Sequence, residues 1–350
     1  MIKRHIAGIT LAAMGLALMG FASSSFCQTT DRDQALNLFG QERWSDAASA
    51  FEALEKQQPG QTDALLYRGK CLVNLKQFKD AGAALQTYLA SHPQSDDAMY
   101  LLAFVLFRQD KPKESLQLFT EAAKLKTPNL DALKIVSFDY VLLKDYVGAG
   151  HYLDIVLQMD PNNLEARYYL GRVRYQQNRL DEAIAAFREV LRRDPGNVKA
   201  EDNLGLCLEG KNQVDQAIAA YKKAIALDES SLVHTEQPYL NLGILQDKNN
   251  NDREALLLLA KAQKIAPKSA EVRYQLAKSL FSLNRVEDAQ REVETALHLN
   301  PNDAASHYLL GRIYHTLGKS DLAVQQFKLT DDLLRAAGGG SASVASGDRK

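Results

Sequence analysis

Small and apolar side chains recur along the chain with a period of 34 residues. In the second period Gly69 is followed twelve residues later by Ala81, and a large apolar residue, Leu85, comes four residues after that. Residues spaced by four and seven share one face of a helix, and small side chains let two helices approach closely. The pattern therefore predicts a pair of packed helices in each period. Its first member stands at Ala35, Gly69, Ala103, Ser137, Gly171, Gly205, Gly243, Ala277 and Gly311.

Proline marks the joints between these periods. Seven of the nine prolines fall at or next to one recurring position, namely Pro59, Pro93, Pro128, Pro161, Pro195, Pro267 and Pro301. Two residues after that position stand side chains that cap helix N-termini: Ser95, Asn129, Asn163, Asn197, Ser269 and Asp303. Acidic residues follow in the first turn, where the helix dipole favours them. We interpret these acids as helix starts and not as a metal site.

The chain resembles the tetratricopeptide repeat family, whose 34-residue pattern runs W-x2-L-G-x2-Y, then A-x3-F, then P. The clearest unit is the last, which contains Leu310, Gly311, Tyr314, Ala323 and Phe327. The resemblance implies an all-α fold, a right-handed superhelical solenoid of about nine antiparallel helix pairs. Nine tandem units would cover residues 28–335.

Two features depart from the family pattern. Gly205 and Gly243 are 38 residues apart, so four extra residues lengthen the joint at about 230–238. In the fifth unit Arg174 replaces the expected aromatic residue, and Tyr175 follows it. A longer joint and a charged side chain are expected at these two places.

The N-terminal segment, residues 1–27, has the pattern of a secretory signal peptide. Lys3 belongs to a basic start, residues 6–22 carry no charge, and small residues precede a cleavage point after Cys27. The uncharged run has 17 residues, at the lower limit for spanning a bilayer core of about 30 Å, so an uncleaved anchor is the alternative. Cys27 could also be acylated, although Phe26 stands where a lipobox has a small residue. We expect an exported protein, periplasmic or secreted, with membrane association only through an uncleaved signal or lipidation of Cys27.

The C-terminal segment, residues 336–350, is rich in Gly and Ser and is expected to be disordered. No capping helix is predicted after the ninth unit. The outer face of that unit is therefore exposed, covered by a partner, or covered by part of the tail.

Charge and composition narrow the function. The 350 residues include 42 Lys and Arg against 43 Asp and Glu, a balance that argues against a nucleic-acid partner. No phosphate-binding loop, dinucleotide fingerprint, nucleophile elbow or zinc-helix motif is present, and the repeats leave no room for a separate catalytic domain. We therefore predict a protein that is not an enzyme, with no cofactor, catalytic residue, metal site or small-molecule substrate.

The cysteines do not predict a disulfide. Cys71 and Cys207 occupy the same position of units two and six, which is too far apart for a bridge. We interpret both as small buried apolar residues, with intermolecular pairing as the alternative.

The resemblance also implies that the first helix of each pair lines a concave face that holds the ligand. Transferring those positions to this sequence gives Tyr100, Phe104, Phe107, Arg108, Phe138, Tyr168, Arg172, Asn203, Asn241, Tyr274, Lys278, Tyr308 and Arg312 as peptide-binding residues. In units five, eight and nine a Tyr is followed four residues later by a cation, so that ring and charge share a helix face. Related domains use Asn amides to hold a peptide backbone. The alternative is that the rings pack against neighbouring first helices.

Two functions follow from this surface. The first is an exported, non-enzymatic interaction protein that binds an extended peptide in its groove. That peptide would be apolar towards units three and four and acidic towards units five to nine. The second is a structural scaffold of a cell-envelope assembly, which contacts its partners through its convex face or its last repeat.

Overall fold

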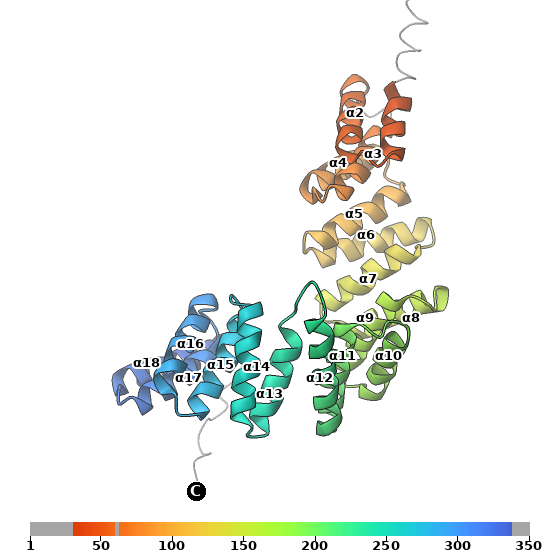
Figure 1. Ribbon diagram of the computed structural model, residues 1–350. Coiled ribbons are helices and arrows are strands. Elements are labelled where there is room, and N and C mark those ends of the chain that lie inside the picture. Colours follow the sequence, from red (N-terminus) through yellow and green to blue (C-terminus); the bar gives the residue numbers. More distant parts are fainter. Residues whose placement is uncertain (1–30, 60–62, 338–350) are drawn as a thin grey trace, which may run out of the picture. The chain divides into compact units, whose positions relative to one another are not determined.

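The computed structural model describes residues 31–59 and 63–337. The predicted signal peptide and nearly all of the predicted tail lie outside these residues. Every regular element in the described residues is a helix, which confirms the all-α class (Figure 1). No helix in this part of the chain is long and apolar enough to cross a membrane.

The helices follow the predicted pairs. Residues 31–40 form the first helix of the first pair. The first helices of the other pairs are α3 (Ala64–Asn74), α5 (Asp96–Arg108), α7 (Leu130–Leu142), α9 (Leu164–Gln176), α11 (Val198–Gly210), α13 (Gln237–Lys248), α15 (Ala270–Ser282) and α17 (Ala304–Thr316). The second helices are α2 (Trp44–Gln57), α4 (Phe78–Ser91), α6 (Pro112–Leu125), α8 (Tyr146–Met159), α10 (Leu180–Arg193), α12 (Val214–Glu229), α14 (Asp252–Ile265), α16 (Val286–Leu299) and α18 (Ser320–Ala336).

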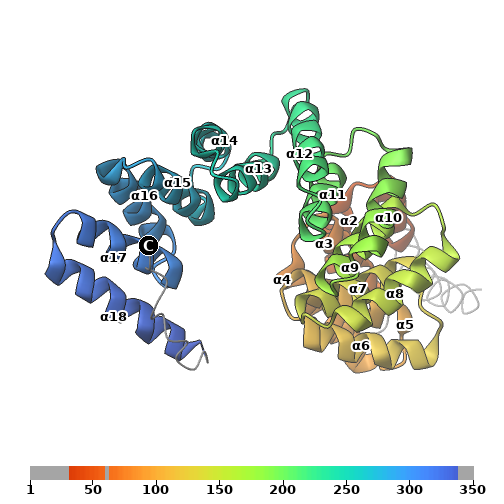
Figure 2. The ribbon, with the colours of Figure 1, turned by 90° about the horizontal axis from the view of Figure 1, so that it is seen from below.

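The chain divides into two compact units, residues 1–166 and 167–350, and the boundary falls inside α9. In each unit helices pack on their neighbours in the chain, as Figure 2 shows for α17 and α18. First helices also contact first helices of adjacent pairs: α3 with α5, α5 with α7, α11 with α13, α13 with α15, and α15 with α17. Each unit therefore has a face made of consecutive first helices.

Each pair is held by a small residue on the first helix facing a large one on the second. In the fifth pair a Cβ added to Gly171 would lie 2.8 Å from Cε1 of the buried Phe187. A Cβ added to Gly69 would lie equally close to Leu85, whose side chain is also fully buried. These contacts confirm the predicted spacing of twelve and then four residues.

The predicted N-caps are confirmed. The side-chain oxygens of Ser95, Asn129, Asn163, Asn197, Ser269 and Asp303 each accept a hydrogen bond from the backbone N–H three residues later. These bonds satisfy backbone donors that have no partner within the helix. The polar residues at the joints thus have a structural role.

Turns within the pairs share a feature that the sequence analysis missed. One residue in each turn has a positive φ: Glu42, Lys76, Asp110, Lys144, Asn178, Asn212, Asn250, Asn284 and Gly318. These residues follow one another at intervals of 34, except for 38 between Asn212 and Asn250. The turns therefore confirm both the period and the four-residue insertion.

Both departures from the family pattern are accommodated locally. The extra residues extend the joint between α12 and α13. The side chain of Arg174 is only 12% exposed, with its Nε 3.3 Å from Glu182 and its Nη1 donating to Gln177 at 2.9 Å. Cys71 and Cys207 are buried free thiols, as predicted.

Candidate functional site

In the first compact unit, residues 1–166, the face made of first helices carries an aromatic pocket of about 510 Å³ between α5 and α7. We call this the aromatic pocket; its apolar lining consists mainly of Tyr100, Leu101, Phe104, Phe107, Ile135 and Phe138. Four of the residues predicted to bind a peptide are therefore brought together on neighbouring helices. Two of the lining phenylalanines, Phe107 and Phe138, have ring centroids 6.1 Å apart.

Packing against neighbours fixes these rings without closing the pocket. Phe104 makes an edge contact with Phe78 at 6.1 Å, and the hydroxyl of Tyr100 donates to the backbone oxygen of Lys126 at 2.7 Å. Both predicted interpretations of the rings, core packing and an open surface, therefore apply to the same side chains. Arg108 is different, because it lies outside the pocket lining with its guanidinium 4.4 Å from the ring of Phe78.

Charges at the rim of the aromatic pocket are paired. The ammonium group of Lys134 lies 3.2 Å from Asp131 and 3.3 Å from Glu165. Burial lowers the pKa of Lys134, but the hydrogen bonds and charges of these two carboxylates outweigh it, so that the pKa lies above its ordinary value. These three groups together leave one negative charge in excess, but all of them are engaged in ion pairs, so that apolar contact is the main interaction that the pocket offers a ligand.

The second compact unit, residues 167–350, carries a more polar pocket of about 450 Å³ between α9, α11 and the start of α13. We call this the polar pocket; its lining includes Tyr168, Tyr169, Arg172, Lys199, Asn203 and Gln237. The amide nitrogen of Asn203 donates to the hydroxyl of Tyr168 at 3.3 Å and to the backbone oxygen of Lys199 at 2.7 Å. Three predicted residues, Tyr168, Arg172 and Asn203, therefore meet here.

Asn241 does not line this pocket, contrary to its predicted role. The residue is 8% exposed, and its Nδ2 donates to both carboxylate oxygens of Asp202 at 2.9 and 3.1 Å. Its Oδ1 accepts from Gln237 at 3.1 Å. Burial raises the pKa of Asp202 to about 7, although the bond from Asn241 acts in the opposite direction. The amide thus holds a buried carboxyl group and is not turned to a ligand.

In the predicted pairs of a Tyr and a cation four residues later, each cation contacts a partner other than that Tyr. Lys278 forms an ion pair with Asp247 at 2.8 Å, and the guanidinium of Arg312 lies 5.2 Å from the ring of Phe281. Both partners come from the preceding helix pair. Arg172 lies 6.0 Å from the ring of Tyr169, its near neighbour on the same helix.

The rings of the other two pairs are partly covered. Tyr274 is half-buried, and burial raises the pKa of its hydroxyl. Tyr308 is 39% exposed, with its ring centroid 5.7 Å from that of Phe327 in the same helix pair.

Candidate metal ligands are dispersed. In the part of the chain that the structure describes, no three His, Cys, Asp or Glu side chains are grouped so as to hold a metal ion. His307 contacts Gln326 through Nδ1 at 2.7 Å and the backbone oxygen of Pro301 through Nε2 at 3.0 Å.

Comparison with protein families matches almost every helix pair to one kind of repeat. Three family models described as tetratricopeptide repeat match the chain. The first covers residues 32–96, 72–129 and 145–198, the second 175–235 and 248–313, and the third 304–329.

Individual relatives are more distant. The chain is 29% identical over 106 residues to the BBSome complex member BBS4 of Xenopus tropicalis, covering 30% of this chain and 20% of that protein. It is 29% identical over 92 residues to anaphase-promoting complex subunit 3 of Schizosaccharomyces pombe, covering 26% of this chain and 14% of the relative. The chain thus spans a fifth or less of these relatives.

Solved structures agree on the fold. A tetratricopeptide repeat protein from Parabacteroides merdae gives a TM-score of 0.55 at 14% identity, covering 72% of this chain and 98% of that one. Yeast Tom70 gives 0.54 at 20% identity, covering 83% of this chain and 59% of its own. At such identities the likeness concerns the fold alone.

Proposed function

The chain belongs to the tetratricopeptide repeat family, and we propose that it is a non-enzymatic interaction protein that binds an extended peptide along its first helices. Repeats of this family form protein-interaction modules. The peptide-binding role and the export of this chain are the parts that we propose.

The aromatic pocket is the observation that carries the proposal. Its volume of about 510 Å³ lies within the range of about 300 to 1,000 Å³ typical of ligand pockets. Phe104 and Phe107 from α5 and Phe138 from α7 give it an apolar lining that is already held in place. A large apolar side chain of a ligand would lose its contact with water there, and the rings need little rearrangement to receive it.

Binding of a peptide by this pocket is tested by selecting random peptides on the full-length chain. We expect a consensus with a large apolar or aromatic residue. The double variant Phe107→Ala/Phe138→Ala should lose that consensus. The matched control is Val147→Ala, because Val147 is 77% exposed on the second helix α8. Selection of the same peptides by the double variant, with helicity unchanged, would exclude the aromatic pocket as the site.

Export is a separate part of the proposal, supported by the signal pattern of residues 1–27. Cleavage after Cys27 would give a chain that begins with Gln28. Cell fractionation with mass spectrometry of the N-terminal peptide tests this and separates it from an anchored or acylated form.

A scaffold role is the second candidate, and one feature of α18 favours it. Val324 is 66% exposed, whereas Ile184, at the same position of the fifth unit, is 7% exposed under the helix that follows. Leu334 is also 43% exposed at this end of the chain. If partners are held here, Val324→Glu should release them while peptides of the aromatic pocket still bind.

A further inference from the structure

The inserted joint between α12 and α13 presents an apolar tip. Leu232 is fully exposed, at 101%, and Val233 is 81% exposed. These are the two most exposed large apolar side chains among the described residues. Exposed apolar side chains mark an interaction site when they are contiguous, and these two residues are neighbours in the chain.

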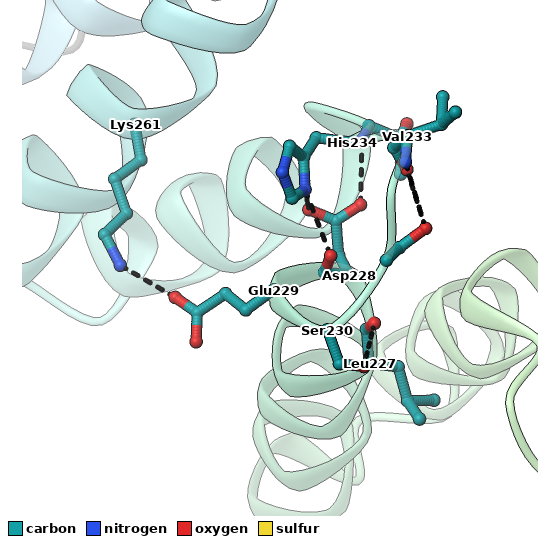
Figure 3. Close-up of polar contacts among 9 residues, drawn as sticks. Leu227, Asp228, Glu229, Ser230, Val233, His234 and Lys261 are labelled. Atoms are coloured by element: carbon teal, nitrogen blue, oxygen red, sulfur yellow. Dashed lines mark hydrogen bonds and ion pairs between the residues drawn. The ribbon is translucent and has the colours of Figure 1, made fainter.

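A buried carboxylate holds this tip in place. Asp228 at the end of α12 is completely buried, and its Oδ1 accepts from the backbone N–H of Thr235 at 2.8 Å (Figure 3). Nδ1 of His234 lies 3.0 Å from the backbone oxygen of Asp228 and 3.2 Å from its Oδ2. Ser231 holds the start of the joint. Its backbone N–H donates to the backbone oxygen of Asp228 at 2.9 Å, and its hydroxyl donates to the backbone oxygen of Val233 at 3.0 Å. The joint is therefore braced at both ends.

The braced joint runs directly into the polar pocket. Thr235, Gln237 and Pro238 all belong to the pocket lining. At no more than about 3.6 Å of chain per residue, Val233 lies within about 7 Å of Thr235 and Leu232 within about 11 Å. The apolar tip is thus next to the wall of the polar pocket.

Charge defines what the pocket accepts. Arg172 and Lys199 are exposed cations of its lining, and Asn203 and Gln237 add amide groups. A carboxylate accepts charge-assisted hydrogen bonds from a guanidinium and an ammonium group. Asp202 also belongs to the lining, but its carboxyl group is buried and bonded to Asn241, so that the exposed charges of the polar pocket are positive.

We propose that the inserted joint is a specificity element of the polar pocket, which takes an extended peptide with an acidic side chain and a large apolar one within three residues. The carboxylate contacts Arg172 and Lys199, and the apolar side chain packs on Leu232 and Val233. This inference rests on the proposed peptide-binding function and names the ligand of a second site, which shares no lining residue with the aromatic pocket.

The test uses fluorescent decapeptide libraries and the full-length chain. One library fixes a Glu and, one to three residues away, a Leu; the second fixes the Glu and replaces the Leu by Ser; the third replaces the Glu by Gln. We expect the first library to bind at least tenfold more tightly than either of the others. The variant Leu232→Ser/Val233→Ser should bind the first library only as tightly as the unaltered chain binds the second. Arg172→Glu should weaken the binding of both the first and the second library. Val147→Ser, which changes an exposed apolar residue elsewhere, should have no effect.

Three results would overturn the inference. The first is equal affinity of the tip variant and the unaltered chain for the first library. The second is the absence of binding to any library while the aromatic pocket still selects peptides, a result that leaves the proposed function intact. The third is a tip that is needed for binding phosphatidylcholine vesicles and not for peptides.

Discussion

The hydroxyl oxygen of Ser115 on α6 lies 2.6 Å from Oδ2 of Asp139 on α7, and both residues are completely buried. The same hydroxyl lies 2.8 Å from the backbone oxygen of Ala103. A hydroxyl group has one proton to donate, and a carbonyl oxygen has none. If both contacts are hydrogen bonds, the Asp139 carboxyl group must supply the second proton, which means that it is protonated. Burial accordingly raises the pKa of Asp139 to about 7, although the bond with Ser115 opposes this.

A neutral Asp139 makes the stability of the first compact unit depend on pH. Between about pH 4 and pH 7 the folded chain keeps a proton that the unfolded chain has released, so the free energy of unfolding falls as pH rises through this window. Asp139→Asn removes this titration, and its amide can donate to Ser115 as the protonated acid does. Relative to the unaltered chain, the variant should gain roughly 2 to 3 kcal/mol between pH 5 and pH 8.

Urea unfolding at the two pH values measures this gain. In the second compact unit, Asp202 should also make the free energy of unfolding fall as pH rises, because its pKa is raised to about 7 as well. The comparison therefore concerns the difference between the two proteins. Parallel pH profiles for the unaltered chain and Asp139→Asn would show that Asp139 is ionised in the folded state.

Packing of the sixth helix pair makes Gly205 sensitive to the smallest enlargement. A Cβ at this position would lie 2.5 Å from Cε1 of Tyr221, whose ring is fully buried and whose hydroxyl donates to Glu209 at 3.0 Å. Because the ring is held at both ends, Gly205→Ala should destabilise the fold by about 1 to 3 kcal/mol. Gly40→Ala is the control, since nothing lies within 4 Å of a Cβ there. Thermal unfolding measures both, and equal midpoints for the two variants would contradict the packing argument.

The sequence predicted the helix pairs well because the contact within a pair depends on spacing alone. Gly205 and Tyr221 meet at a separation of 16 residues, and this separation recurs in the other pairs. The aromatic pocket was predictable for the same reason, since Phe104 and Phe138 occupy one register position of consecutive first helices.

Contacts between pairs were not predictable in this way. Asn241 bonds to Asp202 across 39 residues, and Lys278 pairs with Asp247 across 31. Periodicity places a residue on a face of its own helix, but the direction of a long side chain depends on which groups the preceding pair offers. The inserted joint adds a further difficulty, because four residues outside the period have no equivalent in the other units from which to infer their conformation.

Burial protects the two described cysteines from reagents. It raises the pKa of Cys71 to about 11 and that of Cys207 to about 12, so that almost no thiolate is present near neutral pH. In a Cys27→Ser variant, which leaves only these two thiols, alkylation by iodoacetamide at pH 8 should be on the order of a hundredfold slower than for a free thiol. Unfolding in urea should restore the ordinary rate for both. Fast alkylation of either thiol in the folded chain would mean that its helix pair opens readily.

The turn between α7 and α8 contains Lys144 with a φ of 58°, a conformation that a side chain with a Cβ adopts at a cost of about 1 to 2 kcal/mol. Glycine avoids this cost but loses more backbone entropy on folding, so Lys144→Gly should stabilise the first compact unit by a net of about 0.5 to 1 kcal/mol. Asp110→Gly is the matched control, because Asp110 has a φ of 59° in the preceding turn and Asp tolerates this region better than Lys. Its gain should be clearly smaller. Thermal unfolding of the two variants decides the matter: a lower midpoint for Lys144→Gly would show that the lysine side chain stabilises the turn by more than its backbone conformation costs.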